Sequence, residues 1–171
     1  MTKPAYRQTI QSVTCFLRCG QEYLFIHRTK RSNKVDGGRI NGIGGKVKPG
    51  ETFQTAAIRE IEEETGLNVK LQDCMLKIIG RLEEGYSQDW VVCFFVIDLP
   101  DKKLPIGQEN DEGQLIWLAR DQVHTAGYEL VDDLNYIWDE ITVKPGLFFF
   151  SALLDEDEKI KQMVVEPARL G

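Results

Sequence analysis

The segment from Gly45 to Leu67, "GKVKPGETFQTAAIREIEEETGL", decides how the first half of the chain folds. Its residues follow a helical period from Thr52 to Thr65, and Pro49-Gly50 is typical of a turn that precedes a helix. Gly66 stands where a left-handed C-terminal cap is expected, because glycine adopts that backbone conformation without a steric penalty. The segment therefore predicts a helix over 52–65 that begins and ends at turns.

Four glutamates crowd the end of this predicted helix, where local energetics disfavour them. At about 100° per residue, Glu60, Glu63 and Glu64 fall on one strip of the helix, whereas Glu62 lies on the opposite side. Like charges three or four residues apart repel by about 0.2–0.5 kcal/mol per pair, and acids in the last turn oppose the helix dipole by about 0.3–1 kcal/mol each. Because the strip borders the apolar face of the helix, we expect its carboxylates to be only partly solvated.

Two interpretations of this acidic strip follow from the residues alone. One is a solvated acidic face, which suits Glu62 well. The other is a site at which a divalent cation supplies the missing positive charge, since Mg²⁺ is commonly held by one or two carboxylates together with substrate phosphate oxygens. Arg59 is the one nearby cation in the sequence and is too little to balance the cluster. We expect Arg59 to anchor Glu51 on the preceding loop.

The remaining sequence predicts several strands and one further helix. Residues 29–51 predict a long irregular connection with a short strand near Ile40, and the closing "EPARLG" predicts a frayed tail. The spacing of the apolar residues in "DDLNYIWDEI" predicts a second amphipathic helix. Apolar patterns predict strands in "SVTCFLRCGQEYLFIHR" (two strands turning at Gly20), "KLQDCMLKIIGRLEE", "DWVVCFFVIDL" (central in the sheet), "GQLIWLARDQV" and "GLFFFSALL".

Strands before, between and after two helices predict an α/β (α+β) fold in which a mixed β-sheet is sandwiched between α-helices. The length of 171 residues predicts a single domain over 1–171. A composition of 42% hydrophobic and 28% charged residues is typical of a globular protein and excludes a fibrous or disordered chain.

Charge and composition exclude several classes of partner. The net charge of −6 and a pI near 5.0 argue against binding to duplex nucleic acid, which depends on many contacts from Lys and Arg to phosphate. A small anionic ligand remains compatible if a cation bridges it to the protein. No run approaches the ~20 apolar residues that span a bilayer, and the N-terminus lacks a secretory apolar region. We expect a cytoplasmic protein with no membrane partner and with reduced, structural cysteines at Cys15, Cys19, Cys74 and Cys93.

Several familiar motifs fail to match. The glycine-rich "NGIGGK" is neither a P-loop nor a dinucleotide fingerprint, because Ile40 and Val47 stand where those motifs need glycine, serine or threonine. The acidic "DEDEKI" lacks the glycine of a calcium loop. His27 and His124 are far apart in the sequence, which disfavours a zinc site or a His-based hydrolytic triad.

The segment does resemble the Nudix box, Gly-x5-Glu-x7-Arg-Glu-(aliphatic)-x-Glu-Glu-x-Gly-(aliphatic), at every defined position from Gly45 to Leu67. The resemblance implies a loop-helix-loop that binds Mg²⁺, with Mn²⁺ as a substitute, on the diphosphate of a nucleoside-diphosphate-linked substrate. It implies that Arg59 and Glu51 are an orienting pair. It also implies that the metal ligands are Glu60, Glu64, Glu63 and the backbone carbonyl of Gly44.

Segments outside the box, including "GRINGIGGKV", "ENDEGQLIWLARDQV", "VDDLNYIW" and "GLFFFSALL", are similar to MutT-type 8-oxo-dGTP diphosphatases, the oxidised-purine nucleoside triphosphatases. This second resemblance implies that Glu112 is a further metal ligand or a general base. It implies substrate contacts from Asn41, Lys46, Trp117, Asp132 and Asp133. A purely structural role remains open for four of these residues. Asn41 could cap a turn, Asp132 or Asp133 could cap a helix, and Trp117 could be a core residue. Leu130 and Val131 depart from the aromatic residue that vertebrate members carry before the two Asp.

The expected function is a Mg²⁺-dependent pyrophosphohydrolase that cleaves a purine nucleoside triphosphate to the monophosphate and pyrophosphate, with Glu63 or Glu112 accepting the proton of the attacking water. Two alternatives remain open. One is another substrate, namely a nucleotide sugar, a dinucleoside polyphosphate or an RNA 5′-triphosphate, for which the basic run Arg28 to Lys34 could serve. The other is a nucleotide-binding module without catalysis. We expect a monomer or a homodimer.

Overall fold

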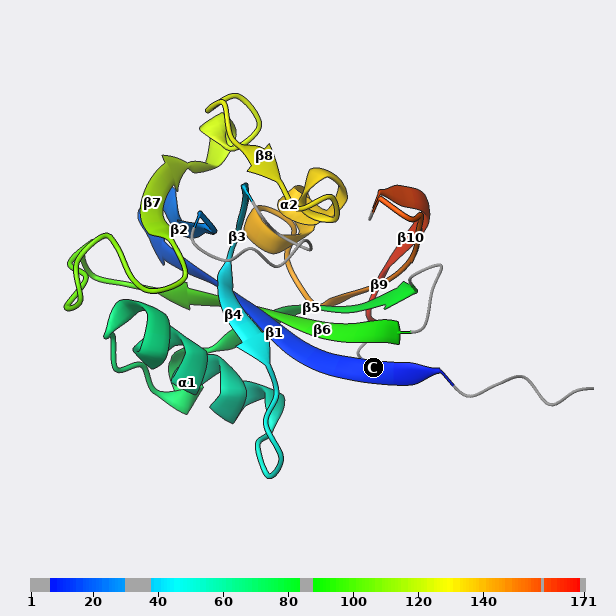
Figure 1. The fold of residues 1–171 in the computed structure, drawn as a ribbon, viewed down its shortest axis with the longest axis horizontal. Coiled ribbons are helices and arrows are strands. Elements are labelled where there is room, and N and C mark those ends of the chain that lie inside the picture. Colours follow the sequence, from blue (N-terminus) through cyan, green and yellow to red (C-terminus); the bar gives the residue numbers. More distant parts are fainter. Residues whose placement is uncertain (1–6, 30–37, 84–87, 158, 170–171) are drawn as a thin grey trace, which may run out of the picture.

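The computed structural model describes residues 7–29, 38–83, 88–157 and 159–169. Most of them belong to one curled sheet with a helix on each face (Figure 1). The helices are α1 (Phe53–Thr65) and α2 (Leu134–Thr142), and two short 3₁₀ helices are η1 (Leu71–Asp73) and η2 (Arg120–Gln122). The strands are β1 (Gln8–Cys19), β2 (Glu22–His27), β3 (Arg39–Asn41), β4 (Ile43–Lys46), β5 (Met75–Glu83), β6 (Gln88–Asp98), β7 (Gln114–Ala119), β8 (Glu129–Leu130), β9 (Phe148–Leu154) and β10 (Ile160–Pro167).

The sheet is mixed, as the sequence predicts. Its strands follow the order β10-β9-β5-β6-β1-β2-β3-β8, while β4 pairs with β1 and β7 pairs with β2. β1 and β6 run parallel along eleven paired positions, and β5 is antiparallel to β6 but parallel to β9. The nearly continuous apolar run of β6 is therefore central, which confirms that prediction.

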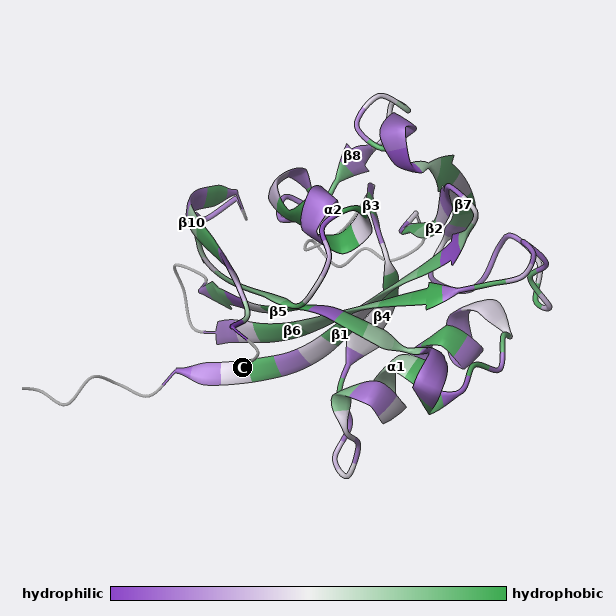
Figure 2. Cartoon of the chain, turned by 180° about the vertical axis from the view of Figure 1, so that it is seen from behind, coloured by the Kyte–Doolittle hydropathy of each residue, from purple (hydrophilic) through white to green (hydrophobic). Residues whose placement is uncertain are grey.

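The two helices pack on opposite faces of this sheet, which confirms the predicted sandwich (Figures 1 and 2). Leu134, Ile137 and Ile141 of α2 join one buried hydrophobic cluster, and Ala57 and Ile61 of α1 join the other. The central strands contribute to both clusters because their side chains alternate between the two faces. In Figure 2 the hydrophobic colour follows stretches of the strands that lie between the helices.

Local chemistry fixes both ends of α1. The Thr52 hydroxyl accepts a hydrogen bond from the backbone N–H of Thr55, and the Thr55 hydroxyl accepts one from the N–H of Thr52, which forms a reciprocal cap. Gly66 ends the helix with φ of 73°, in the left-handed region, and its N–H donates to the carbonyl of Glu62. The predicted helix and its glycine cap are confirmed, so the acids of the last turns are held on a well-defined scaffold.

Two strands differ from the sequence-based expectation. β4 lies within the connection that the sequence predicts as irregular apart from a strand near Ile40, and it pairs antiparallel with β1 from Ser12 to Cys15. The prediction of a frayed tail at "EPARLG" is wrong for its first residues, because Glu166 and Pro167 belong to β10 and pair with β9. Strand pairing over long sequence distances overrides weak local signals in both places.

Other sequence predictions are confirmed in detail. β1 and β2 form the hairpin that turns at Gly20, and the short strand near Ile40 is β3. The second amphipathic helix is α2, and all four cysteines carry unbridged thiols. The basic run Arg28 to Lys34 lies mostly outside the described residues. Within the described ranges, no helix is both long enough and apolar enough to cross a membrane.

Candidate active site

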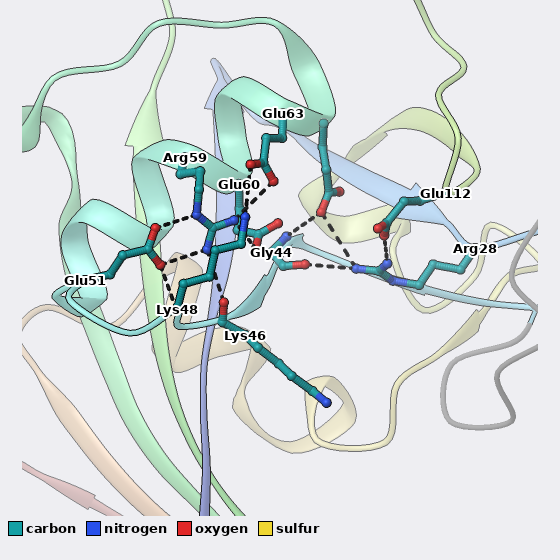
Figure 3. Close-up of polar contacts among 10 residues, drawn as sticks. Arg28, Gly44, Lys46, Lys48, Glu51, Arg59, Glu60, Glu63 and Glu112 are labelled. Carbon is teal, nitrogen blue, oxygen red and sulfur yellow. Dashed lines mark hydrogen bonds and ion pairs between the residues drawn. The ribbon is translucent and has the colours of Figure 1, made fainter.

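The acidic strip of α1 lies beside Gly44 of β4 (Figure 3), and Glu60 also lies next to Gly45. A Cβ atom added to Gly45 would stand 2.6 Å from the Oε1 atom of Glu60, and one added to Gly44 would stand 2.1 Å from the carbonyl oxygen of Val13. Glycine at position 45 therefore leaves space for the Glu60 carboxylate, and glycine at position 44 lets β4 lie close against the backbone of β1. The N–H of Gly44 donates to the Glu64 carboxylate.

Arg59 organises the outer part of the acidic strip. Its Nε and Nη2 atoms donate to the two carboxylate oxygens of Glu51 at 2.5 and 2.9 Å, and Nη2 also donates to the Lys46 carbonyl at 3.1 Å. Its Nη1 atom donates to Glu60 at 2.7 Å and to Glu63 at 3.1 Å. A guanidinium has five N–H donors, and five acceptor contacts surround this one. The expected pairing of Arg59 with Glu51 is thus present, and these bonds lower the pKa of Glu51 to about 2.

The three acids of the strip differ sharply in exposure. The Glu64 side chain is 5% exposed and that of Glu60 is 12% exposed, which agrees with the expectation of partial solvation. Glu63 is 51% exposed and contacts Lys48 as well as Arg59, so it is also partly solvated but much more exposed than the other two.

Glu64 is the least satisfied of these carboxylates. Its Oε1 atom accepts a hydrogen bond from the Gly44 N–H at 3.3 Å, while its buried Oε2 atom has no hydrogen-bond partner in the described part of the chain. Burial raises the pKa of Glu64 to about 8, although Arg28 acts in the opposite direction. A buried carboxylate oxygen with no donor is costly, so its retention points to a ligand.

Residues from two other segments complete the site, and sequence reasoning did not identify them as parts of it. Arg28, just after β2, donates to the Gly44 carbonyl at 3.1 Å and to the Glu112 carboxylate. Asn110 donates from Nδ2 to the backbone carbonyl of Glu64 at 2.8 Å, and its Oδ1 accepts from the N–H of Glu112. The acidic run that contains Asn110 was a visible signal, whereas Arg28 was marked only as the first residue of the basic run Arg28 to Lys34 and not as a partner of the acids.

These segments enclose a cavity of about 550 Å³. It is lined by Glu60, Glu63, Glu64, Ile106, Glu109, Asn110, Asp111 and Glu112. All six carboxylates among them come from α1 or from the segment 109–112, so the cavity is strongly acidic. Within the described residues, no three acidic, histidine or cysteine side chains already converge as a ready metal cluster. The guanidinium groups of Arg28 and Arg59 lie between the acids instead (Figure 3).

The residues expected to contact the base have varied surroundings. Asn41 closes β3 and its Oδ1 accepts from the Gly42 N–H at 2.7 Å. Lys46 is exposed, and its Nζ lies 5.6 Å from the centre of the Trp90 ring. Trp117 packs against the hydrophobic cluster under α1, and its Nε1 atom is buried with no hydrogen-bond partner among the described residues.

The two aspartates before α2 lie in different environments. Asp132 accepts from the N–H of Ile160 at 2.7 Å and lies 3.8 Å from the Nζ atom of Lys159, so its carboxylate ties the start of β10 to the start of α2. Asp133 occupies the N-cap position of α2, but its side chain makes no capping hydrogen bond. Helix capping therefore does not account for Asp133.

Replacing Arg59 with Lys should destabilise the protein by roughly 1–3 kcal/mol, because a lysine ammonium cannot reproduce the planar fork and leaves carboxylate acceptors unsatisfied. Urea unfolding measures this loss. Arg18→Lys is the matched control, since Arg18 also makes a two-pronged pair, with Asp98, away from the acidic strip. Equal losses in the two variants would contradict a special role for the Arg59 network.

Glu64 should give the metal-free protein a distinctive pH dependence. Its pKa is raised from 4.5 to about 8, so the folded protein binds this proton more tightly than the unfolded chain does. The resulting stability is complete below the unfolded value and is lost as the pH rises through the folded value. With chelator present, the free energy of unfolding should fall more steeply between about pH 5 and about pH 8 in the wild type than in Glu64→Gln. Parallel pH profiles would contradict the assignment.

Comparison with known proteins places this geometry in a family. The NUDIX domain model matches residues 8–136. The chain is 30% identical over 111 residues to the NAD-capped RNA hydrolase NudC of Haemophilus influenzae, which covers 65% of this chain and 39% of that protein. It is 46% identical over 50 residues to the oxidized purine nucleoside triphosphate hydrolase of Danio rerio, which covers 27% of this chain and 32% of that protein. The chain thus matches well under half the length of these curated relatives.

Solved structures show the same fold. The mutator MutT protein of Bacillus halodurans superposes with a TM-score of 0.76 at 20% identity, covering 93% of this chain and 99% of that one. A MutT Nudix hydrolase of Burkholderia pseudomallei gives a TM-score of 0.65 at 23% identity, covering 79% of this chain and 99% of that one. Because the NUDIX model spans most of the chain and the box is intact in the structure, the chain belongs to the Nudix family of hydrolases.

Proposed function

We propose that this chain is a Mg²⁺-dependent nucleoside triphosphate pyrophosphohydrolase that converts purine nucleoside triphosphates, including oxidised ones such as 8-oxo-dGTP, to the monophosphate and pyrophosphate. One observation carries the proposal. The buried carboxylate of Glu64 presents an oxygen without a hydrogen-bond partner in the described residues, beside the glycine strand and inside an acidic cavity. A hard dication satisfies such an oxygen and brings polyphosphate into a cavity that would otherwise repel it.

The residues present fit a magnesium ion. Carboxylate and backbone carbonyl oxygens are the donors that Mg²⁺ prefers, and the proposed ligands are of these kinds only. They are Glu60, Glu63, Glu64, Glu112 and the carbonyl of Gly44. When bound, the ion supplies charge neutralisation on the phosphate oxygens and polarises the attacking water. Mn²⁺ is the expected substitute, because it favours the same oxygen donors.

The protein side of the reaction is proton transfer and positioning. Glu63 and Glu112 are the two candidates for the group that accepts the proton of the attacking water. Glu63 is half-exposed at the rim and Glu112 is 24% exposed on the facing segment, so both carboxylates border the cavity. Arg59 and Glu51 act through the other acids by fixing their orientation, as their five-contact network supports. Comparing Glu63→Gln with Glu112→Gln distinguishes the two acceptors.

The purine preference rests on weaker support. The zebrafish relative is named for oxidised purine nucleoside triphosphates, and the matching sequence includes only 27% of this chain. Asn41, Lys46, Trp117, Asp132 and Asp133 are the proposed substrate contacts. The buried, unbonded Nε1 atom of Trp117 supports a role for that residue, whereas the bonds from Asp132 to the start of β10 favour a structural one.

A second substrate class has an observation in its favour. Relatives that match over 111 residues are named as NAD-capped RNA hydrolases. A dinucleotide with a central diphosphate suits the same metal site, and so do nucleotide sugars, dinucleoside polyphosphates and RNA 5′-triphosphates. A non-catalytic nucleotide-binding module is the remaining alternative, and the complete set of box acids argues against it.

Replacing Glu64 with Gln should leave the fold intact and reduce turnover by about a hundred-fold or more, because metal-assisted charge stabilisation contributes several kcal/mol to the barrier. Glu62→Gln is the matched control, since Glu62 is exposed on the opposite side of the same helix and should retain full activity. Circular dichroism of both variants checks that they are folded. Unchanged hydrolysis by Glu64→Gln would remove this helix from the chemistry.

A substrate panel should identify the class. Initial rates with 8-oxo-dGTP, dGTP and dATP are compared with those for NAD, a nucleotide sugar, a dinucleoside polyphosphate and a 5′-triphosphorylated RNA. Released pyrophosphate, phosphate and nucleotide are quantified separately. We expect the highest kcat/KM with a purine nucleoside triphosphate and pyrophosphate as the product. A preference for NAD or capped RNA would favour the second class, and binding of nucleotide with Mg²⁺ but no turnover would favour the binding module.

A further inference from the structure

The guanidinium of Arg28 lies among three of the proposed metal ligands (Figure 3). Its Nη2 atom donates to the Gly44 carbonyl at 3.1 Å and stands 4.0 Å from the Glu64 Oε1 atom. Its Nη1 atom donates to the carboxylate of Glu112. The Arg28 side chain is 13% exposed, so this cation is largely buried with the groups that it contacts. Three segments distant in sequence are therefore joined through one positive group.

The guanidinium competes with a hard dication for this group of oxygen atoms. The Gly44 carbonyl and one carboxylate oxygen of Glu112 already accept hydrogen bonds from Arg28, and Nη2 of Arg28 stands 4.0 Å from Oε1 of Glu64, whose Oε2 is left without a donor among the described residues. Two cations placed side by side also repel each other, and more strongly where the groups are largely buried, as Arg28 and Glu64 are. Arg59 does not raise this conflict at Glu64, because its donors go to Glu51, Glu60, Glu63 and the Lys46 carbonyl.

We propose that Arg28 is a resident cation of the metal-free enzyme, one that holds Gly44, Glu64 and Glu112 together and must withdraw from them when a divalent ion binds. This inference rests on the proposed function, because it takes those three residues as metal ligands. Arg28 is then a positioning residue that offsets the repulsion among the carboxylates before the ion binds. It also sets the affinity for the ion, since each binding event has to break the contacts of Arg28.

A consequence for the substrate follows from charge. An arginine that has left two carboxylates is stabilised by a new anion, and a polyphosphate that arrives with the ion provides one. Metal and nucleotide should therefore strengthen each other's binding, and the coupling must be reciprocal. Metal binding alone should be weak in the wild type, because Arg28 then gives up its partners without a replacement.

The movement of Arg28 can be observed directly in the full-length protein. We would follow the arginine side-chain Nε and Cζ resonances by carbon-detected NMR, assign Arg28 from its loss in Arg28→Lys, and titrate chelator-treated protein with MgCl₂. Calorimetry on the same sample measures ion binding independently. The Arg28 resonances should shift in step with the calorimetric isotherm, while those of Arg18, paired with Asp98 elsewhere, should stay in place.

The outcomes separate this inference from the function on which it rests. Ion binding by calorimetry with unmoved Arg28 resonances would overturn the inference and leave the proposed function standing. Absence of ion binding, with and without a nucleotide analogue, would overturn both.

A variant pair gives a second, independent measurement. In chelator, Arg28→Gln should have a lower Tm than the wild type, because Glu64 and Glu112 lose their cation. Saturating MgCl₂ should raise its Tm by more than it raises that of the wild type, and Mg²⁺ should bind to it about tenfold more tightly or better than to the wild type under the same conditions. Arg18→Gln carries the same charge change and should respond to Mg²⁺ as the wild type does. An Arg28→Gln variant with an unchanged or weaker Mg²⁺ affinity would overturn the inference.

Discussion

The repulsion among carboxylates at the end of α1 is the constraint on which the site depends. Glu60, Glu63 and Glu64 share one strip of the helix in a position where the helix dipole also opposes them. The protein meets this constraint with two guanidinium groups. Arg59 joins the exposed part of the strip to the preceding loop, and Arg28 joins the buried part to β4 and to the facing segment. The carboxylates can lie close to one another because the guanidinium groups of Arg28 and Arg59 lie between them and offset their repulsion.

The sheet makes this arrangement possible by bringing β4 against α1. β4 pairs with β1, whose other edge is fixed along its length to β6 at the centre of the fold. Gly45 leaves space for the Glu60 carboxylate, and Gly44 lets β4 lie close against the backbone of β1. Rigid strands therefore set the distance between Gly44 and Glu64, and the helix cap at Gly66 sets where the acidic strip ends. The strands and the helix cap therefore set the positions of the carboxylates, whereas Arg28 and Arg59 balance their charge.

Much of this organisation could be predicted from the sequence because its causes are local. The period of α1, its glycine cap and the pairing of Arg59 with Glu51 depend on residues within a few turns of one another. The contacts of Arg28 and Asn110 could not be predicted, because they join the acidic strip to residues that lie 16 to 84 positions from their partners. The exposure of Glu63 depends on which surface the neighbouring strands leave uncovered, and helix geometry alone does not determine that. The roles of the individual site residues remain proposals.

The bond from Asn110 to the carbonyl of Glu64 also constrains how this protein can vary. A Cβ atom on Gly66 would meet Ile106 at 2.8 Å, so the segment between Ile106 and Asn110 lies directly on the end of α1. Insertions there would displace the wall of the cavity formed by residues 106–112 relative to the wall formed by α1. The stretch 100–104 has no such hydrogen bond to the helix end in the described contacts, so a change of loop length there would leave this wall of the cavity in place.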